Sequence, residues 1–138
     1  MILKVLIVDD EALARIGIRT IIPWKENGFQ IVGEASSVAE AQELCRKSFP
    51  DIIMLDIAMP GKDGFQLIRQ IKDELPWCKF IIVSCMNDLE HYKKAVNSGV
   101  SAFIEKSTIN KTSLLESLKG VRKQIEKEYF SDRVRAGE

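Results

Sequence analysis

The sequence is poor in the residues on which secreted, membrane-spanning and many hydrolytic proteins depend. It has three cysteines, one histidine and no apolar run that approaches the ~20 residues of a membrane span. The cysteines are odd in number and lack a C-x-x-C spacing, so they indicate reduced thiols in a cytoplasmic protein rather than a disulfide framework or a zinc site. No secretory signal peptide is expected, because Lys4 interrupts the opening apolar stretch.

An excess of charge of one sign is also absent. The chain has 20 basic and 20 acidic residues, and this balance gives no global argument for nucleic-acid or membrane binding. The single histidine, His91, lies in a polar helical stretch without a nucleophile elbow, which argues against a Ser-His-Asp hydrolase. The length of 138 residues suits one domain with a single core.

Apolar runs rich in valine and isoleucine alternate with stretches of helical periodicity. Strands are expected at about Leu3–Val8, Gln30–Ala35, Ile52–Leu55, Lys79–Ser84 and Ala102–Glu105. Helices are expected at about Glu11–Ile22, Ser37–Ser48, Gly64–Glu74, Asp88–Ser98 and Lys111–Glu128. Short, nearly unbroken apolar strands are typical of a parallel sheet covered on both faces, so the pattern predicts a three-layer α/β fold with right-handed crossovers.

Polar side chains stand where four of these strands end. Asp9 and Asp10 follow the first strand, Asp56 the third, Ser84 closes the fourth, and Lys106 follows the fifth. Ligands of open α/β sheets bind beyond the carboxyl ends of the strands, near the point where the strand order reverses. The sequence therefore predicts one polar site at this edge of the sheet.

Carboxylates brought this close repel one another unless a cation or a proton intervenes. Mg²⁺ suits such a site because it is a hard cation that takes oxygen ligands, here Asp9 or Asp10, Asp56 and one loop carbonyl. With charge neutralised, an Asp56 oxygen can attack phosphorus and form an acyl phosphate. Lys106 can supply a positive charge, and the Ser84 hydroxyl can donate a hydrogen bond to the phosphoryl group.

At this point the chain resembles the receiver domain of a two-component response regulator, over about residues 2–128. The resemblance rests on the motifs Val8-Asp9-Asp10-Glu11, Leu55-Asp56, Met59-Pro60, Asp63-Gly64, Val83-Ser84 and Phe103-Ile104-Glu105-Lys106. It implies a flavodoxin-like doubly wound (βα)5 fold with a five-stranded parallel sheet in the order 2-1-3-4-5. It also implies that Asp56 accepts a phosphoryl group from a histidine kinase in a phosphorelay, without turnover as an enzyme.

The resemblance assigns the remaining roles as well. Asp9, Asp10, Asp56 and the backbone carbonyl of Ala58 would bind Mg²⁺, and Ser84 and Lys106 would bind the phosphoryl group. Ser84 and Phe103 would form a switch in which the aromatic ring turns inward on phosphorylation. The face of the fourth helix, fifth strand and fifth helix would then pair with a second copy, giving a phosphorylation-dependent homodimer.

Five positions bear on how far the chain departs from the family pattern. Ser107 stands where a proline with a cis bond is usual, so we expect a trans bond or a distorted loop after Lys106. Phe103 replaces the commoner tyrosine and cannot donate a hydroxyl hydrogen bond. Cys85 follows Ser84, where alanine or glycine is usual. Ala58 and Met86 flank the site with nonpolar side chains that cannot orient a hydrolytic water, which predicts slow loss of phosphate.

The end of the chain permits two interpretations. Leu114, Leu118, Val121 and Ile125 have the 4-3-4 spacing of a coiled-coil seam, but a helix packed on the sheet explains most of it equally well. We expect residues 1–128 to be the receiver and 129–138 a linker to an output domain outside this chain. The segment 22–29 resembles regulators with an AraC-type helix-turn-helix output, so DNA would be bound only through that domain, and no membrane contact is expected.

Other functions fit the residues less well. A haloacid-dehalogenase-like phosphatase needs Asp-x-Asp after the first strand, whereas Asp9 and Asp10 are adjacent. A flavodoxin-like FMN carrier needs a Ser/Thr-rich loop there, and the sequence has Glu11-Ala12-Leu13-Ala14. A phosphate-independent interaction domain with a decayed site remains an alternative because of Ser107 and Cys85. The cysteines Cys45 and Cys78 are predicted to be packing residues.

Overall fold

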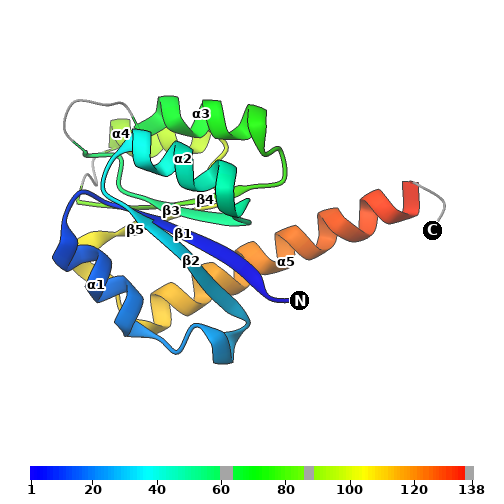
Figure 1. Cartoon of the computed structure of the whole chain (residues 1–138), viewed down its shortest axis with the longest axis horizontal. Coiled ribbons are helices and arrows are strands. Elements are labelled where there is room, and N and C mark those ends of the chain that lie inside the picture. The colour runs from blue at the N-terminus through cyan, green and yellow to red at the C-terminus, as the bar shows by residue number, and fades with distance from the viewer. Residues whose placement is uncertain (60–63, 86–88, 136–138) are drawn as a thin grey trace.

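The structure is a computed structural model that describes residues 1–59, 64–85 and 89–135, with side chains described as far as residue 131. Five parallel strands form one sheet in the order β2-β1-β3-β4-β5 (Figure 1). The strands are β1 Leu3–Val8, β2 Phe29–Ala35, β3 Ile52–Leu55, β4 Lys79–Ser84 and β5 Ala102–Glu105. The helices are α1 Ala12–Ile21, α2 Val38–Ser48, α3 Gly64–Glu74, α4 Leu89–Asn97 and α5 Lys111–Arg135, with 3-10 turns at Lys25–Asn27 and Lys106–Thr108.

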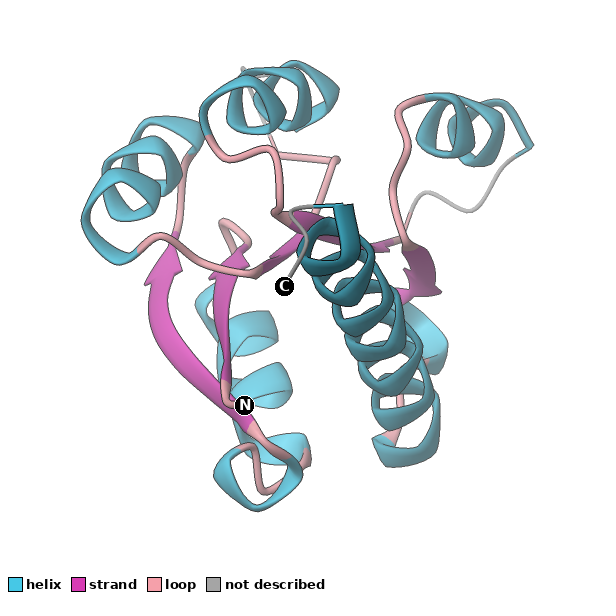
Figure 2. Cartoon of the chain, turned by 90° about the vertical axis from the view of Figure 1, so that its right-hand side faces the viewer, coloured by secondary structure: helices cyan, strands magenta, loops and turns pink. Residues whose placement is uncertain are grey.

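Helices cover both faces of the sheet, with α2, α3 and α4 on one side and α1 and α5 on the other (Figures 1 and 2). Successive side chains of a strand point to opposite faces. In β1, Leu6 and Val8 join the core under α2 and α3, whereas Val5 and Ile7 join the core that α1 and α5 cover. The central strand β3 is apolar throughout because both of its faces are buried, as the predicted three-layer fold requires.

The flavodoxin-like architecture and the strand order 2-1-3-4-5 are confirmed. Four strands have the predicted bounds, and β2 begins one residue earlier, at Phe29. Ser37 caps α2, since its hydroxyl accepts a hydrogen bond from the backbone N–H of Glu40 at 3.2 Å. In the described part of the chain, no helix is long and apolar enough to cross a membrane.

The last helix is longer than predicted. It ends at Arg135 rather than near Glu128, because no glycine or proline interrupts residues 121–135. Leu114, Leu118 and Val121 are buried against the sheet, so this part of the stripe packs within the domain. Past the edge of the sheet the helix continues alone (Figure 1).

Candidate functional site

The pairing of the central strands brings the predicted acids together. Val8 of β1 lies opposite Leu55 of β3, so Asp9 and Asp56 follow them side by side. The backbone N–H of Asp56 donates to the carbonyl of Val8 at 3.0 Å, and that of Asp9 donates to Ala35 at 3.0 Å. The strand order reverses between β1 and β3, so both aspartates lie at the switch point of the sheet.

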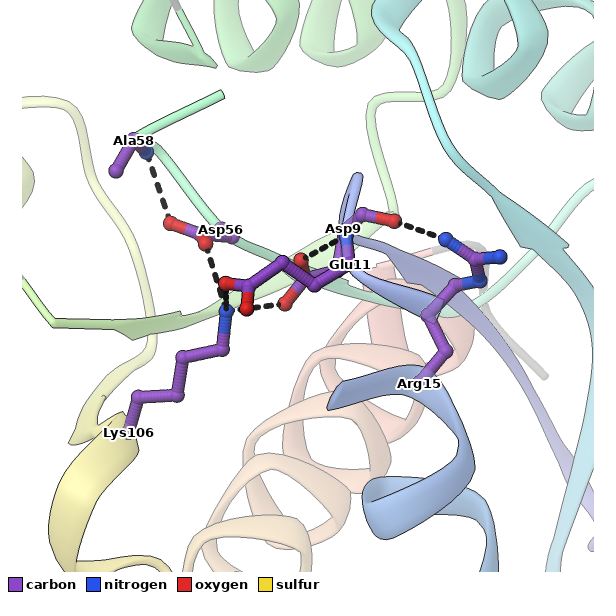
Figure 3. A network of polar contacts seen from close by, with 6 residues as sticks. All are labelled: Asp9, Glu11, Arg15, Asp56, Ala58 and Lys106. Carbon is purple, nitrogen blue, oxygen red and sulfur yellow. Dashed lines mark hydrogen bonds and ion pairs between the residues drawn. The ribbon is translucent and has the colours of Figure 1, made fainter. Parts of the chain in front are cut away.

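Lys106 reaches this point from β5, the edge strand of the sheet. Ser84 pairs in register with Glu105, and Lys106 directly follows at the end of β5. Its Nζ lies 2.8 Å from Asp9 Oδ2, 3.0 Å from Asp56 Oδ2 and 2.8 Å from Glu11 Oε1 (Figure 3). One ammonium group is therefore shared by three carboxylates.

The two buried aspartates are held differently. Asp56 Oδ1 accepts a hydrogen bond from the backbone N–H of Ala58 at 2.8 Å, while Oδ2 faces Lys106 (Figure 3). Asp9 Oδ1 accepts the backbone N–H of Glu11 at 2.9 Å. Asp9 Oδ2 is buried, and within the described residues it has the close charge of Lys106 but no hydrogen bond of good geometry.

Burial and charge act in opposite directions at this site. Burial raises the pKa of Asp9, and the Asp56 carboxylate adds to that rise, while Lys106 and the N–H of Glu11 lower it. For Lys106, burial by itself would lower the pKa, but the carboxylates of Asp9, Glu11 and Asp56 outweigh it and raise the pKa above its usual range. The lysine therefore stays charged, and the neighbouring carboxylates repel one another.

The donor set fits a divalent cation. One carboxylate oxygen each from Asp9, Asp10, Glu11 and Asp56 can be chosen so that all lie within 4.8 Å of one another. Lys106 contacts three of these four carboxylates and carries one positive charge, so negative charge is in excess. The buried Asp9 Oδ2 also lacks a well-formed hydrogen bond, as a metal ligand would before its ion binds. All donors are hard oxygens, which favours Mg²⁺.

The structure adds two residues to which the sequence pattern assigned no role. Glu11 contacts Lys106, as described above. Arg15, on the first turn of α1, donates from Nη1 to the backbone carbonyl of Asp9 at 2.5 Å (Figure 3). Its Nε lies 3.4 Å from Glu34 of β2. A glutamate and an arginine four residues apart at the start of a helix often form an ion pair, and this was the signal that the sequence offered. The Arg15 side chain instead bonds the backbone carbonyl of Asp9 at the end of β1.

The other predicted residues lie around this cluster. Ser84 is fully buried at the end of β4, next to the strand that carries Asp56. Phe103 is partly buried, and its ring meets that of Tyr92 edge-on with 5.9 Å between the ring centres. The switching role of these two residues stays a prediction.

The structure shows the backbone after Lys106 and the position of Cys85, two of the places where the sequence departs from the family pattern. The described residues contain no cis peptide bond, so the trans bond expected after Lys106 is present, and the segment turns into a short 3-10 helix. Lys106 nevertheless reaches both aspartates. Cys85 is exposed. Met86 and the Pro60–Asp63 part of the motif lie outside the described residues.

The fold and the site together define a doubly wound α/β domain with a carboxylate and lysine cluster at its switch point. Residues 5–119 match the response regulator receiver domain, and the chain belongs to this family of two-component response regulators.

Individual relatives agree with this assignment. The chain is 30% identical over 125 residues to the transcriptional regulatory protein YesN of Bacillus subtilis, covering 91% of this chain and 34% of YesN. The REC domain of AraT, a response regulator from Geobacillus stearothermophilus, is 32% identical with a TM-score of 0.84, covering 94% of this chain and 99% of that one.

A second similar structure has a name that includes ligands. It is a chain of the CheX-CheY-BeF3-Mg²⁺ complex from Borrelia burgdorferi, 26% identical with a TM-score of 0.77, covering 86% of this chain and 88% of that one. The present chain spans between 34% and 56% of the length of three curated relatives that it matches.

Proposed function

We propose that this receiver domain accepts a phosphoryl group on Asp56 from a histidine kinase, in a reaction that depends on Mg²⁺. The observation that carries the proposal is the position of Asp56. Its carboxylate is buried, one oxygen is held by the N–H of Ala58 and the other lies 3.0 Å from the Lys106 ammonium. A nucleophile so oriented, beside a fixed positive charge, suits attack on phosphorus.

The proposed step has two reactants, the Asp56 carboxylate and the phosphohistidine of the kinase. A carboxylate oxygen of Asp56 forms a bond to the phosphorus of the phosphohistidine while the P–N bond breaks. The departing imidazole nitrogen keeps the electron pair of that bond and takes a proton from solvent. Lys106 then balances the added negative charge, and Ser84, at the end of the neighbouring strand, supplies a hydroxyl donor.

Asp9, Asp10, Asp56 and the backbone carbonyl of Ala58 are the groups proposed to hold Mg²⁺. When bound, the ion supplies neutralisation of negative charge that Lys106 by itself does not supply. The fit of the four clustered carboxylates supports this role, as does the similarity to a chain from a complex that contains BeF3 and Mg²⁺.

Phosphorylation is proposed to act through Ser84 and Phe103 on the face formed by α4, β5 and α5. That face would then pair with a second copy of the domain. Because the relatives include transcriptional regulatory proteins longer than this chain, the output is proposed to be transcription control, with DNA bound by an output domain outside residues 1–138. The three free thiols fit a reducing, cytoplasmic location.

The domain is proposed to be a stoichiometric phosphoacceptor and not a turnover enzyme. The methyl side chain of Ala58, two residues after Asp56, has no polar atom with which to orient an attacking water. Slow loss of phosphate, over minutes or longer, follows from this.

The test is incubation with Mg²⁺ and acetyl phosphate, followed by intact mass measurement. We expect a gain of one phosphate in the wild-type chain and in the surface variant Glu43→Gln, and none in Asp56→Asn. Steady release of phosphate from the donor would instead indicate an enzyme. No adduct under saturating Mg²⁺ would favour the alternative, an interaction domain with a decayed site.

A further inference from the structure

Glu11 differs from the other two carboxylates that contact Lys106. The side chains of Asp9 and Asp56 are 2% and 6% exposed, whereas that of Glu11 is 64% exposed. All three have an oxygen within 3.0 Å of the same Nζ. Nζ donates hydrogen bonds to Glu11 and Asp56, whereas Asp9 is held by charge without a well-formed hydrogen bond.

A phosphoryl group on Asp56 would compete with these carboxylates for the ammonium group. Asp9 is buried directly beside Asp56, so its negative charge cannot move away from the ammonium group. Releasing Glu11 only returns an exposed carboxylate to water. The ammonium group therefore gives up Glu11 at the lowest free-energy penalty.

Apart from its place among the four clustered carboxylates, the side chain of Glu11 has no second contact in the described residues that the fold depends on. Glu11 is the N-cap of α1, but its side chain makes no capping hydrogen bond. Its backbone N–H holds Asp9 Oδ1, and any non-proline residue at this position can supply that donor. A change confined to the side chain therefore separates the contact with Lys106 from the folding of the site.

We propose that Glu11 is a positioning residue that competes with the phosphoryl group for Lys106. In the unphosphorylated domain it holds the ammonium at the mouth of the site, and it is displaced when the phosphoryl group arrives. Glu11 thus sets how readily the domain becomes and stays phosphorylated. This inference rests on the function proposed for Asp56.

The experiment measures beryllofluoride affinity by ¹⁹F NMR at saturating Mg²⁺, in the wild type, Glu11→Gln and Glu11→Asp. Both variants lose the ion pair. Aspartate is one methylene shorter and keeps the charge, whereas glutamine keeps the length and an acceptor oxygen but loses the charge. Because an exposed ion pair changes an equilibrium by at most about fivefold, we expect both variants to bind beryllofluoride about two to five times more tightly. Glu43→Gln, which removes an exposed carboxylate paired with Lys47 on α2, should match the wild type.

The outcomes separate the two proposals. If the wild type binds beryllofluoride and both Glu11 variants bind it equally well, the competition is refuted while the phosphoacceptor function stands. If only Glu11→Gln binds more tightly, general charge repulsion and not the contact is responsible, which also overturns the inference. If the wild type binds no beryllofluoride and gains no phosphate on Asp56, the proposed function fails and this inference fails with it.

Discussion

At the scale of single residues, burial separates the three cysteines of the chain. Cys45 and Cys78 are buried, as the sequence predicted, and Cys85 is exposed next to Ser84. Burial raises the pKa of the Cys45 thiol to about 11, with a smaller rise from Glu74, and burial raises that of Cys78 further. The reactive thiolate is therefore scarce at both buried positions.

Thiol labelling of the native protein at pH 8 is expected to modify Cys85 alone. About one Cys45 in a thousand is ionised there, given a pKa of about 11, and its sulfur is also covered. Iodoacetamide labelling followed by peptide mass spectrometry checks this, and unfolding in urea should expose all three sites. Rapid native labelling of Cys45 or Cys78 would show that those core positions open easily.

At the scale of an element, the two halves of α5 lie in different surroundings. Its first half presents Leu114, Leu118 and Val121 to the sheet core, whereas Tyr129 and Phe130 near its end are exposed. Asn110 and Ser113 fix where the helix begins, because each side chain accepts a hydrogen bond from the backbone N–H of the other, at 2.9 and 3.0 Å. The domain should therefore depend on the buried half of α5.

Leu118→Ala is expected to lower the free energy of unfolding by about 2–5 kcal/mol, because it removes a fully buried side chain and leaves a cavity. Lys119→Ala, at the exposed neighbouring position, should change it by less than about 0.5 kcal/mol. Urea unfolding followed by circular dichroism measures both. Equal effects would contradict the packing of this half of α5 on the sheet.

At the scale of the whole molecule, the site is a junction between distant segments. Asp9 and Glu11 follow β1, Asp56 follows β3 and Lys106 follows β5, so their convergence requires the sheet to be assembled. A cation that binds these carboxylates can bind only the folded chain. Binding to the folded state alone stabilises it by mass action.

Mg²⁺ at ten times its dissociation constant is expected to add about 1.4 kcal/mol to the free energy of unfolding. Asp10→Asn should lose most of this gain, whereas Glu43→Gln should keep it. The measurement is the urea midpoint with Mg²⁺ and with NaCl at matched ionic strength. An equal midpoint in the two salts would exclude a specific cation site.

The sequence by itself determined the architecture and most of the site. Valine- and isoleucine-rich runs such as Leu3–Val8 can be buried on both faces only in a covered parallel sheet, so strand bounds and layer order were predictable. Polar residues directly after such runs must meet at one edge of the sheet. Asp9, Asp56 and Lys106 were found in this way because the argument needs only the positions of the strand ends.

Only the tertiary structure decided which of those charged groups form ion pairs with one another. The three-way contact of Lys106 joins residues separated by 50 and 95 positions, and no local pattern specifies which acid a long, flexible side chain selects. The hold of Arg15 on the Asp9 carbonyl likewise depends on how α1 packs beside β1 and β2. Periodicity and turn residues are local signals, whereas ion-pair choice depends on distances that exist only after folding.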